Sequence, residues 1–366
     1  MALRIGVNAL YLIPGKVGGT EIYLRNVLQA LCEIDQTNEY FVFRNQETGH
    51  DLTPSAANFH DCPQPVSGEN RPARILFEQF CLPIVARGKR IDVLFNAGFT
   101  APLAWSGPMV TVFHDLQYKR HPEYFRWFDL PFWRTLLPAS AYRSRRIIVP
   151  SGAVKADIAQ FYPFALSRTE VIRHGVEANF AEIAETRSDH RFILTVSTLH
   201  PHKNLDGLLR AFKLFNRPGW RLVIAGLKGF EAGRIESLRV DLDLNDSVEI
   251  KGWIPRGDLY ELFRTASAFV YPSRFEGFGI PVLEAMTAGL PVACSRIPAL
   301  VEIAGDAVLF FDPANVGEMA AALEEVTMDQ GVRSRLRAAG LMRSREFSWE
   351  KSARHLLEVF QQAAQG

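Results

Sequence analysis

Residues 271–291 read YPSRFEGFGIPVLEAMTAGLP, and this stretch decides the predicted fold. The apolar run that ends at Tyr271 is typical of a strand, and the glycine pair after it indicates a loop. Pro281 suits the first turn of a helix, and Gly289 suits its end. The freed amides of such a loop, together with the positive end of the helix, hold a diphosphate without a metal. We therefore expect a phosphate cradle in a parallel α/β sheet.

The rest of the chain repeats this strand and helix alternation in two series, which predicts an α/β protein with two tandem Rossmann-like, doubly wound domains. We expect domains at 1–180 and 181–345, and a C-terminal helix at 346–366. The pattern of this helix suits packing on either domain, including a return to the first. Ligands of such sheets bind at the carboxyl ends of the strands, so the active site is expected in the cleft between the domains. The expected strands are 4–9, 40–43, 93–96, 109–113, 146–149, 169–173, 192–196, 221–225, 248–251, 268–270, 291–293 and 308–311.

Composition excludes several classes of protein. The 366 residues carry 41 Lys and Arg against 40 Asp and Glu, a net charge of +1, so no global field favours nucleic acid. The start of the chain lacks the pattern of a signal peptide, and we expect a cytoplasmic protein. The four cysteines are far apart without a C-x-x-C pair, which argues against a zinc site or a disulfide framework; they are Cys32, Cys62, Cys81 and Cys294.

Two carboxylates flank the predicted cradle, Glu276 in the loop and Glu284 in the helix. A carboxylate that accepts two adjacent hydroxyls is a common way to hold a ribose or a sugar ring. Spacing alone favours the plainer interpretation, in which Glu276 is a solvated loop residue and Glu284 a surface helix residue.

The segment from Glu276 to Glu284, with Gly277-Phe278-Gly279 inside it, resembles the E-x7-E signature of glycosyltransferase family 4, retaining enzymes with the GT-B fold. Five further segments match the family in the same order, so the resemblance extends over nearly the whole chain. They are 149–151, 171–176, 196–204, 304–307 and 347–349.

The resemblance implies a role for each matching residue of the second domain. Glu284 would hold the ribose hydroxyls of a nucleotide, and Glu276 the hydroxyls of the donated sugar. Lys203 would neutralise the diphosphate, and Trp253 with Ile254 would read the base. The family often has Arg before that lysine, where this chain has His202. The amides that would meet the diphosphate and sugar belong to Phe278, Gly279 and Ile280.

The first domain offers two candidates after predicted strands. Gly18 and Gly19 open a helix, and although a glycine pair is a common turn, this one coincides with the family's N-terminal glycine loop. His114 ends the strand at 109–113, where family members carry a histidine beside the reacting sugar. A histidine that is only hydrogen-bonded within the strand end explains the same position.

Two further features have a functional and a plainer interpretation. Residues 131–156 lack acids, and they suit either a membrane-surface face or a packed helix with a basic outer side. The nearby aromatics are Phe125, Trp127, Phe128 and Trp133. Asp241-Leu242-Asp243 has the form of a cation site, but it sits late in a helical stretch, so we expect a helix end and no metal.

Together with the candidate residues, the resemblance implies a metal-independent retaining hexosyltransferase with no cofactor beyond its nucleotide-sugar donor. The resemblance is strongest to mannosyl-type enzymes of surface polysaccharide or glycolipid synthesis, which favours GDP-mannose as the donor and a glycan or lipid-linked acceptor. Peripheral contact with the inner face of the membrane is an added expectation. An NAD(P)-dependent oxidoreductase is one alternative, but Val282 stands where its G-x-G-x-x-G fingerprint needs the third glycine. A non-catalytic sugar-nucleotide-binding protein is the other.

Overall fold

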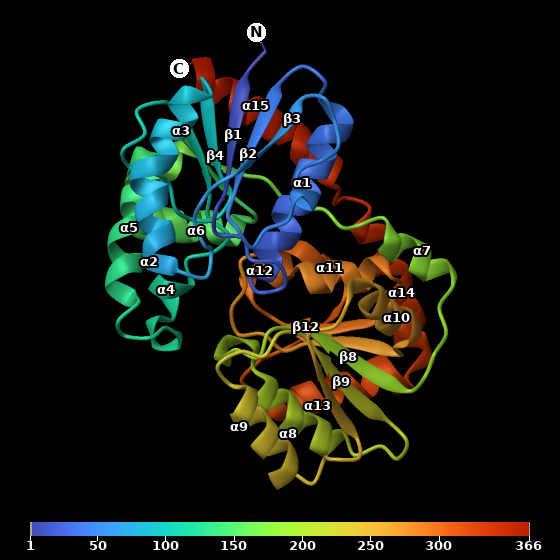
Figure 1. Ribbon diagram of the computed structural model, residues 1–366. Helices are drawn as coiled ribbons and strands as arrows, with labels where there is room; N and C mark the ends of the chain where they lie inside the picture. The colour runs from blue at the N-terminus through green and yellow to red at the C-terminus, as the bar shows by residue number, and fades with distance from the viewer. Residues whose placement is uncertain (1, 366) are drawn as a thin grey trace. The chain divides into compact units, whose positions relative to one another are not determined.

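The computed structural model describes residues 2–365 and divides the chain into two units (Figure 1). The first unit comprises the residues up to Gly175 and those from Trp349 on, and the second is Val176–Ser348. Sequence placed these boundaries after residues 180 and 345. The segment 176–180 falls in the second unit because Phe180 is buried there, edge-on against Tyr260 and Phe263 at 5.2 and 5.0 Å between ring centroids.

The first unit is built on a seven-stranded parallel sheet in the order β3-β2-β1-β4-β5-β6-β7. Its central strands are apolar and buried on both faces, as parallel strands covered by helices should be. The sequence did not predict β3, because Phe59–Pro63 is a short edge strand with polar His60 and Asp61. The strands are β1 (Arg4–Ala9), β2 (Glu39–Arg44), β3 (Phe59–Pro63), β4 (Val93–Asn96), β5 (Met109–Val112), β6 (Arg146–Val149) and β7 (Thr169–Val171).

Helices cover this sheet, and the last helix of the chain is one of them. In α15, Phe360 is fully buried and lies edge-on against Phe95 of β4 at 5.3 Å. Figure 1 shows α15, in red, beside α1 and the strands of the first sheet. The helices are α1 (Gly19–Ile34), α2 (Arg71–Leu76), the π turn η2 (Phe77–Cys81), α3 (Leu82–Gly88), α4 (Gln117–Arg120), α5 (Leu130–Arg143), α6 (Gly152–Phe161) and α15 (Trp349–Gln365).

The second unit repeats the plan with a six-stranded parallel sheet in the order β10-β9-β8-β11-β12-β13. The two parallel sheets confirm the predicted α/β class. The strands are β8 (Phe192–Val196), β9 (Arg221–Ala225), β10 (Val248–Gly252), β11 (Ala268–Tyr271), β12 (Val292–Ser295) and β13 (Leu309–Phe311). The helices are α7 (Asn179–Glu185), α8 (Leu205–Phe215), α9 (Ala232–Asp241), α10 (Arg256–Thr265), α11 (Ile280–Thr287), α12 (Pro298–Ala304), α13 (Val316–Met328) and α14 (Gln330–Ser344).

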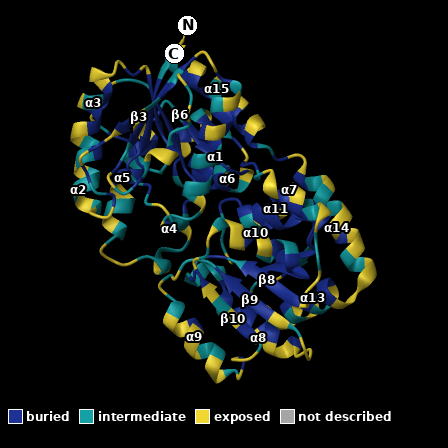
Figure 2. Ribbon diagram, turned by 45° about the vertical axis from the view of Figure 1, so that its right-hand side comes forward, coloured by how far each residue is buried: buried dark blue, intermediate teal, exposed yellow. Residues whose placement is uncertain are grey.

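Burial follows this layering, with dark blue strands inside and yellow helix faces outside in each unit (Figure 2). Within residues 2–365, no helix combines the length and the apolar character needed to cross a bilayer. Short 3₁₀ turns complete the structure, namely η1 (His50–Leu52), η3 (Pro122–Tyr124), η4 (Pro163–Arg168), η5 (Pro201–Lys203) and η6 (Gly305–Ala307).

Candidate functional site

The loop between β11 and α11 has the form that its sequence predicts. Gly279 precedes the helix with a φ of 107°, a left-handed conformation that favours glycine, and Pro281 lies in the first turn. A Cβ on Gly279 would lie 2.4 Å from Cδ2 of Leu300, so any other residue here would have to displace that leucine side chain and would also be strained at this φ. Phe278 and Ile280 are buried on either side. The amides at the start of α11 are therefore held in a fixed arrangement.

Lys203 and Glu276 form a half-buried ion pair beside this loop. Lys203 Nζ donates to Glu276 Oε1 at 2.6 Å and to the hydroxyl of Tyr271 at 2.9 Å. The side chains of Lys203 and Glu276 are only 14% and 12% exposed. Asn204, at a φ of 55°, fixes the turn because its side-chain Nδ2 donates to the backbone carbonyls of Pro272 and Pro313 at 3.0 and 2.8 Å. A bound anion would share Lys203 with Glu276.

His202 contributes its backbone to the same loop. Its carbonyl accepts from the amide of Arg274 at 2.7 Å and from the hydroxyl of Ser273 at 3.1 Å. The imidazoles of His202 and His200 are stacked at 5.9 Å. Burial and then the charge of Lys203 lower the pKa of His200. The side chain of Arg274 itself is exposed.

Glu284 is buried in α11 with 3% exposure, so the plainer interpretation of a surface helix residue is wrong. Its Oε1 accepts from Arg256 Nη2 at 2.7 Å, and the same nitrogen donates to Glu177 Oε1 at 2.8 Å. Burial raises the pKa of Glu284, and Arg256 opposes that rise. Burial also acts to lower the pKa of Arg256, but Glu284 and Glu177 outweigh it, so this pKa is raised and the guanidinium stays charged.

Arg256 and Glu177 are the residues that sequence analysis missed. Arg256 begins α10, three residues after Trp253, so the signal available was a cation at a helix start next to the predicted base-reading position. Its guanidinium lies over the rings of Phe180 and Tyr260 at 5.2 and 5.3 Å. Glu177 had no sequence signal, because its partner is distant in the chain.

The two residues predicted to read a base follow β10 directly. Gly252 ends that strand at a φ of 67°, where the ladder to β9 is irregular. Trp253 is 60% exposed and Ile254 is partly buried. An exposed indole three residues before Arg256 offers a flat apolar face.

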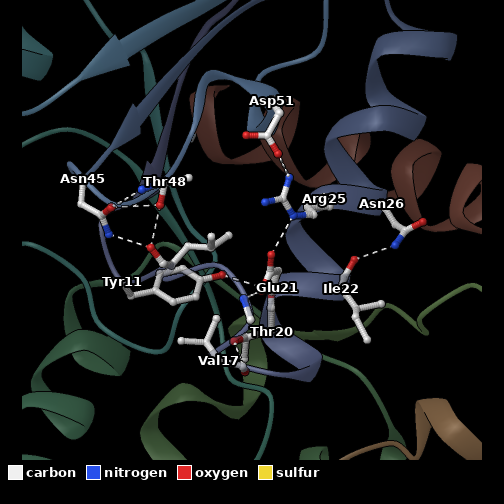
Figure 3. Close-up of polar contacts among 12 residues, drawn as sticks. Tyr11, Val17, Thr20, Glu21, Ile22, Arg25, Asn26, Asn45, Thr48 and Asp51 are labelled. Atoms are coloured by element: carbon white, nitrogen blue, oxygen red, sulfur yellow. Dashed lines mark hydrogen bonds and ion pairs between the residues drawn. The ribbon is translucent and has the colours of Figure 1, made fainter. Parts of the chain in front are cut away.

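In the first unit, Gly18 and Gly19 open α1 as predicted. Gly18 caps the helix at a φ of 60°. The loop is braced by Glu21, whose Oε2 accepts from the amide of Gly15 at 2.8 Å, while Oε1 accepts from Arg25 Nε at 2.9 Å. Arg25 also donates, through Nη1, to Asp51 Oδ2 at 2.9 Å (Figure 3). This bond ties the start of α1 to the η1 turn of the same unit.

His114 follows β5 and is buried, with Nε2 at 2.8 Å from the carbonyl of Ala97. Burial lowers its pKa to about 4 and the Ala97 bond opposes this, so the ring is neutral at pH 7. The hydroxyl of Tyr11 lies 3.3 Å from the carbonyl of Thr20 (Figure 3). It also lies 3.4 Å from the carbonyl of Ala97. Tyr11 therefore joins the glycine loop to the neighbourhood of His114. The rings of Tyr23 and Phe99 lie edge-on to His114, at 5.0 and 5.2 Å.

The remaining motifs divide between packing and exposure. In the acid-free window, Trp133 packs edge-on against Phe125 at 6.4 Å, whereas Trp127 and Phe128 are 81% and 55% exposed. Asp241 is the last residue of α9, as the helix-end interpretation expects. Across residues 2–365, no group of three or more His, Cys, Asp or Glu is placed to hold a metal ion.

Comparison with known proteins matches each unit to a glycosyltransferase family model. The family model for glycosyl transferases group 1 matches residues 177–343, and that for Glycosyltransferase Family 4 matches 17–180. O-antigen chain mannosyltransferase B of Escherichia coli is 29% identical over 264 residues, 69% of each chain. O-antigen chain mannosyltransferase RfbU of Salmonella typhimurium is 28% identical over 213 residues, 58% of this chain and 59% of that one.

Solved structures show the same fold. Sucrose-phosphate synthase from Thermosynechococcus elongatus superposes with a TM-score of 0.80 at 19% identity, over 98% of both chains. HepE from Anabaena, solved with UDP and glucose, gives a TM-score of 0.75 at 17% identity, over 98% of this chain and 99% of that one. With both sheets, both family matches and the mannosyltransferase relatives in agreement, the chain belongs to the family 4 glycosyltransferases, has the GT-B fold, and is mannosyltransferase-like.

Proposed function

We propose that this glycosyltransferase moves a hexose, with retention of configuration and without a metal, from a nucleoside diphosphate sugar to a glycan or lipid-linked acceptor. GDP-mannose is the proposed donor, because the relatives are named as mannosyltransferases of O-antigen chains. The observation that carries the proposal is the Lys203–Glu276 pair beside the fixed amides of the Gly279 loop. It sets a cation, a carboxylate and helix-start donors side by side.

Each of these groups has a proposed task in holding the donor. The diphosphate takes the amides of residues 278–280 and the Lys203 ammonium, which neutralises the charge that develops on the leaving phosphate. Glu276, released from Lys203, accepts hydroxyls of the donated sugar. Glu284 accepts the ribose hydroxyls, and Arg256 keeps its carboxylate ionised and oriented. Trp253 and Ile254 cover the base.

The acceptor is proposed to bind on the first unit, at the glycine loop and His114. A neutral His114 donates to or accepts from a hydroxyl without adding charge, in keeping with its lowered pKa. None of the groups proposed here is a carboxylate free to act as nucleophile, since Glu276 and Glu284 are both engaged in binding. We therefore favour front-face attack, in which the acceptor oxygen bonds the anomeric carbon as the phosphate oxygen leaves and takes the acceptor proton. Positioning and charge stabilisation are then the protein's contributions.

We also propose that the enzyme works in the cytoplasm, peripherally on the inner face of the membrane. All four cysteines are free, which suits a reducing compartment. The relatives are named as mannosyltransferases of O-antigen chains, which suits an enzyme that acts at a membrane surface.

Transfer from GDP-mannose in EDTA tests the proposal, with product anomers identified by NMR and membrane lipid extract as the source of acceptor. An α-mannoside formed from the α-linked donor is expected. A β-product would contradict retention, and a requirement for added magnesium would contradict metal independence. A panel of other nucleotide sugars in the same assay tests the choice of donor.

A further inference from the structure

The helical segment from Arg71 to Arg90 combines exposed apolar and basic side chains on the first unit. Leu76, Phe80 and Ile84 are 59%, 63% and 69% exposed. They recur every fourth residue through α2, η2 and α3. In a regular α-helix, with 3.6 residues per turn, side chains four residues apart drift gradually around the helix axis. The π turn at Phe77–Cys81 has more residues per turn and offsets this drift, so the three side chains stay in line. We call these three residues the apolar stripe.

The same segment has five bases and one acid, and the acid does not face solvent. Glu78 is 2% exposed, and it accepts from the hydroxyl of Thr100 at 3.0 Å. Around the end of α3, three of the bases are exposed, and no described residue forms an ion pair with any of them. These bases, which we call the basic end, are Arg87, Lys89 and Arg90.

Two exposed aromatics lie near the start of the same segment. Arg71 Nη1 donates to Asp129 at 2.5 Å, and its guanidinium lies 4.7 Å from the ring centroid of Phe132. This contact brings the residues just before Asp129, which are the exposed Trp127 and Phe128, close to α2. Figure 2 shows α2, α3 and α5 on one side of this unit, with exposed positions along them in yellow.

We infer that the apolar stripe and the basic end dock this unit on the surface of an anionic lipid bilayer. Three large apolar side chains in a line, bases that form no ion pair with any described residue, and a nearby exposed tryptophan are what an interfacial helix needs. Anionic headgroups complement the unpaired bases, and the apolar side chains enter the boundary of the acyl chains. The inference deepens the membrane contact proposed above, and it moves the contact from residues 131–156 to a segment that sequence analysis passed over.

Vesicle binding tests this inference without donor or acceptor. Failure to bind vesicles can therefore be distinguished from failure of the proposed transferase activity. Co-sedimentation is measured with vesicles of phosphatidylcholine alone and of phosphatidylcholine mixed with phosphatidylglycerol. We expect the full chain to bind the mixed vesicles at least about tenfold more tightly, and to lose this preference in high salt. Equal binding to both vesicles, or none to either, would overturn the inference.

Two triple variants separate the contributions of the two parts. Leu76→Gln with Phe80→Gln and Ile84→Gln removes the stripe, and Arg87→Glu with Lys89→Glu and Arg90→Glu reverses the basic end. Each should weaken binding to mixed vesicles about tenfold or more. A matched control changes three exposed apolar residues of the second unit, 53–64% exposed, and should bind like the wild type; it is Leu214→Gln with Phe230→Gln and Val240→Gln.

Cys81 supplies an internal probe that needs no variant. It is next to Phe80 and is exposed, whereas Cys32 is partly covered and Cys62 and Cys294 are buried. Mixed vesicles should slow its alkylation by a water-soluble maleimide severalfold, and phosphatidylcholine vesicles should not. An unchanged rate would contradict docking. Sedimentation without lipid adds a last check, because a dimer that the stripe variant converts to monomer would make this face a protein interface instead.

Discussion

The two glutamates flanking the loop should respond differently to neutralisation. Glu276→Gln removes the carboxylate partner of Lys203, and Glu284→Gln removes the proposed ribose acceptor. Both substitutions keep the size of the side chain. Affinity for a nucleoside diphosphate without its sugar separates the two roles, because only Glu284 should contact that ligand.

The magnitudes follow from the partners of each residue. A hydrogen bond to a charged group contributes roughly 1.5–3 kcal/mol, so Glu284→Gln should weaken nucleoside diphosphate binding about ten- to hundredfold. In Glu276→Gln, the Lys203 ammonium loses its charged partner and keeps two neutral acceptors, the amide oxygen of the new side chain and the hydroxyl of Tyr271, so it is no longer shared with a carboxylate. Affinity should then stay equal or rise by up to about tenfold, while transfer of the sugar falls.

Isothermal titration of GDP into the wild type and both variants measures these affinities. Urea unfolding of each protein serves as the control, since Glu284 is buried and its substitution also acts on stability. Variants that unfold with wild-type midpoints but differ in GDP affinity as stated support the roles. Equal affinities in all three proteins would refute the assignment.

Three further predictions concern the stability of the site. The free energy of unfolding should fall as the pH drops from 6.5 towards 4, and His114 should contribute up to roughly 3 kcal/mol of this fall, because burial holds the pKa of His114 at about 4 while the unfolded ring titrates near 6.5. His114→Gln should remove this share in urea unfolding at pH 8 and pH 5, while the share of His174, whose pKa burial also lowers, should remain. Arg256→Met should lower the free energy of unfolding by roughly 2–4 kcal/mol at pH 8, and by less at pH 5, because it leaves Glu284 buried without its cation. Gly279→Ala should lower the free energy of unfolding by roughly 1–3 kcal/mol and abolish measurable GDP binding. The added Cβ would meet the side chain of Leu300, and a φ of 107° is strained for any residue with a side chain.

Each of these predictions has a matched control. His50→Gln changes an exposed histidine of the first unit and should leave the pH dependence as it is in the wild type. Arg264→Met removes an exposed ion pair of α10 and should cost less than about 1 kcal/mol. Gly233→Ala adds a methyl group where nothing lies within 4 Å and should be harmless. A site variant that behaves like its control would contradict the corresponding argument.

The fold could be predicted from sequence because its strands are buried on both faces. Runs such as 93–96 and 192–196 are almost continuously apolar, without the alternation of polar and apolar residues that marks a half-exposed strand. The predicted runs match β4 and β8 in full. The strand Phe59–Pro63 was missed because an edge strand carries polar residues and has no such pattern. Burial also decides the boundary near residue 175, since it depends on what Phe180 touches and not on local composition.

The candidate site was predictable where chemistry lies within one loop. The Gly279 turn and its helix follow from spacing, and the resemblance added Lys203. The Arg256–Glu177 pair was not predictable, because it joins residues 79 positions apart that only the packing of α10 brings together. The apolar stripe was missed for another reason, since only measured exposure separates it from an ordinary core helix.

Thermal unfolding with a panel of nucleotide sugars, in EDTA and then in excess magnesium, tests the central claim most directly. A ligand at about 100 times its Kd stabilises the folded state by roughly 2.7 kcal/mol, which is readily seen as a higher Tm. We predict that GDP-mannose raises the Tm in EDTA, that magnesium adds nothing, and that Lys203→Met loses the shift. No shift with any donor of the panel, or a shift that appears only with magnesium, would contradict the account.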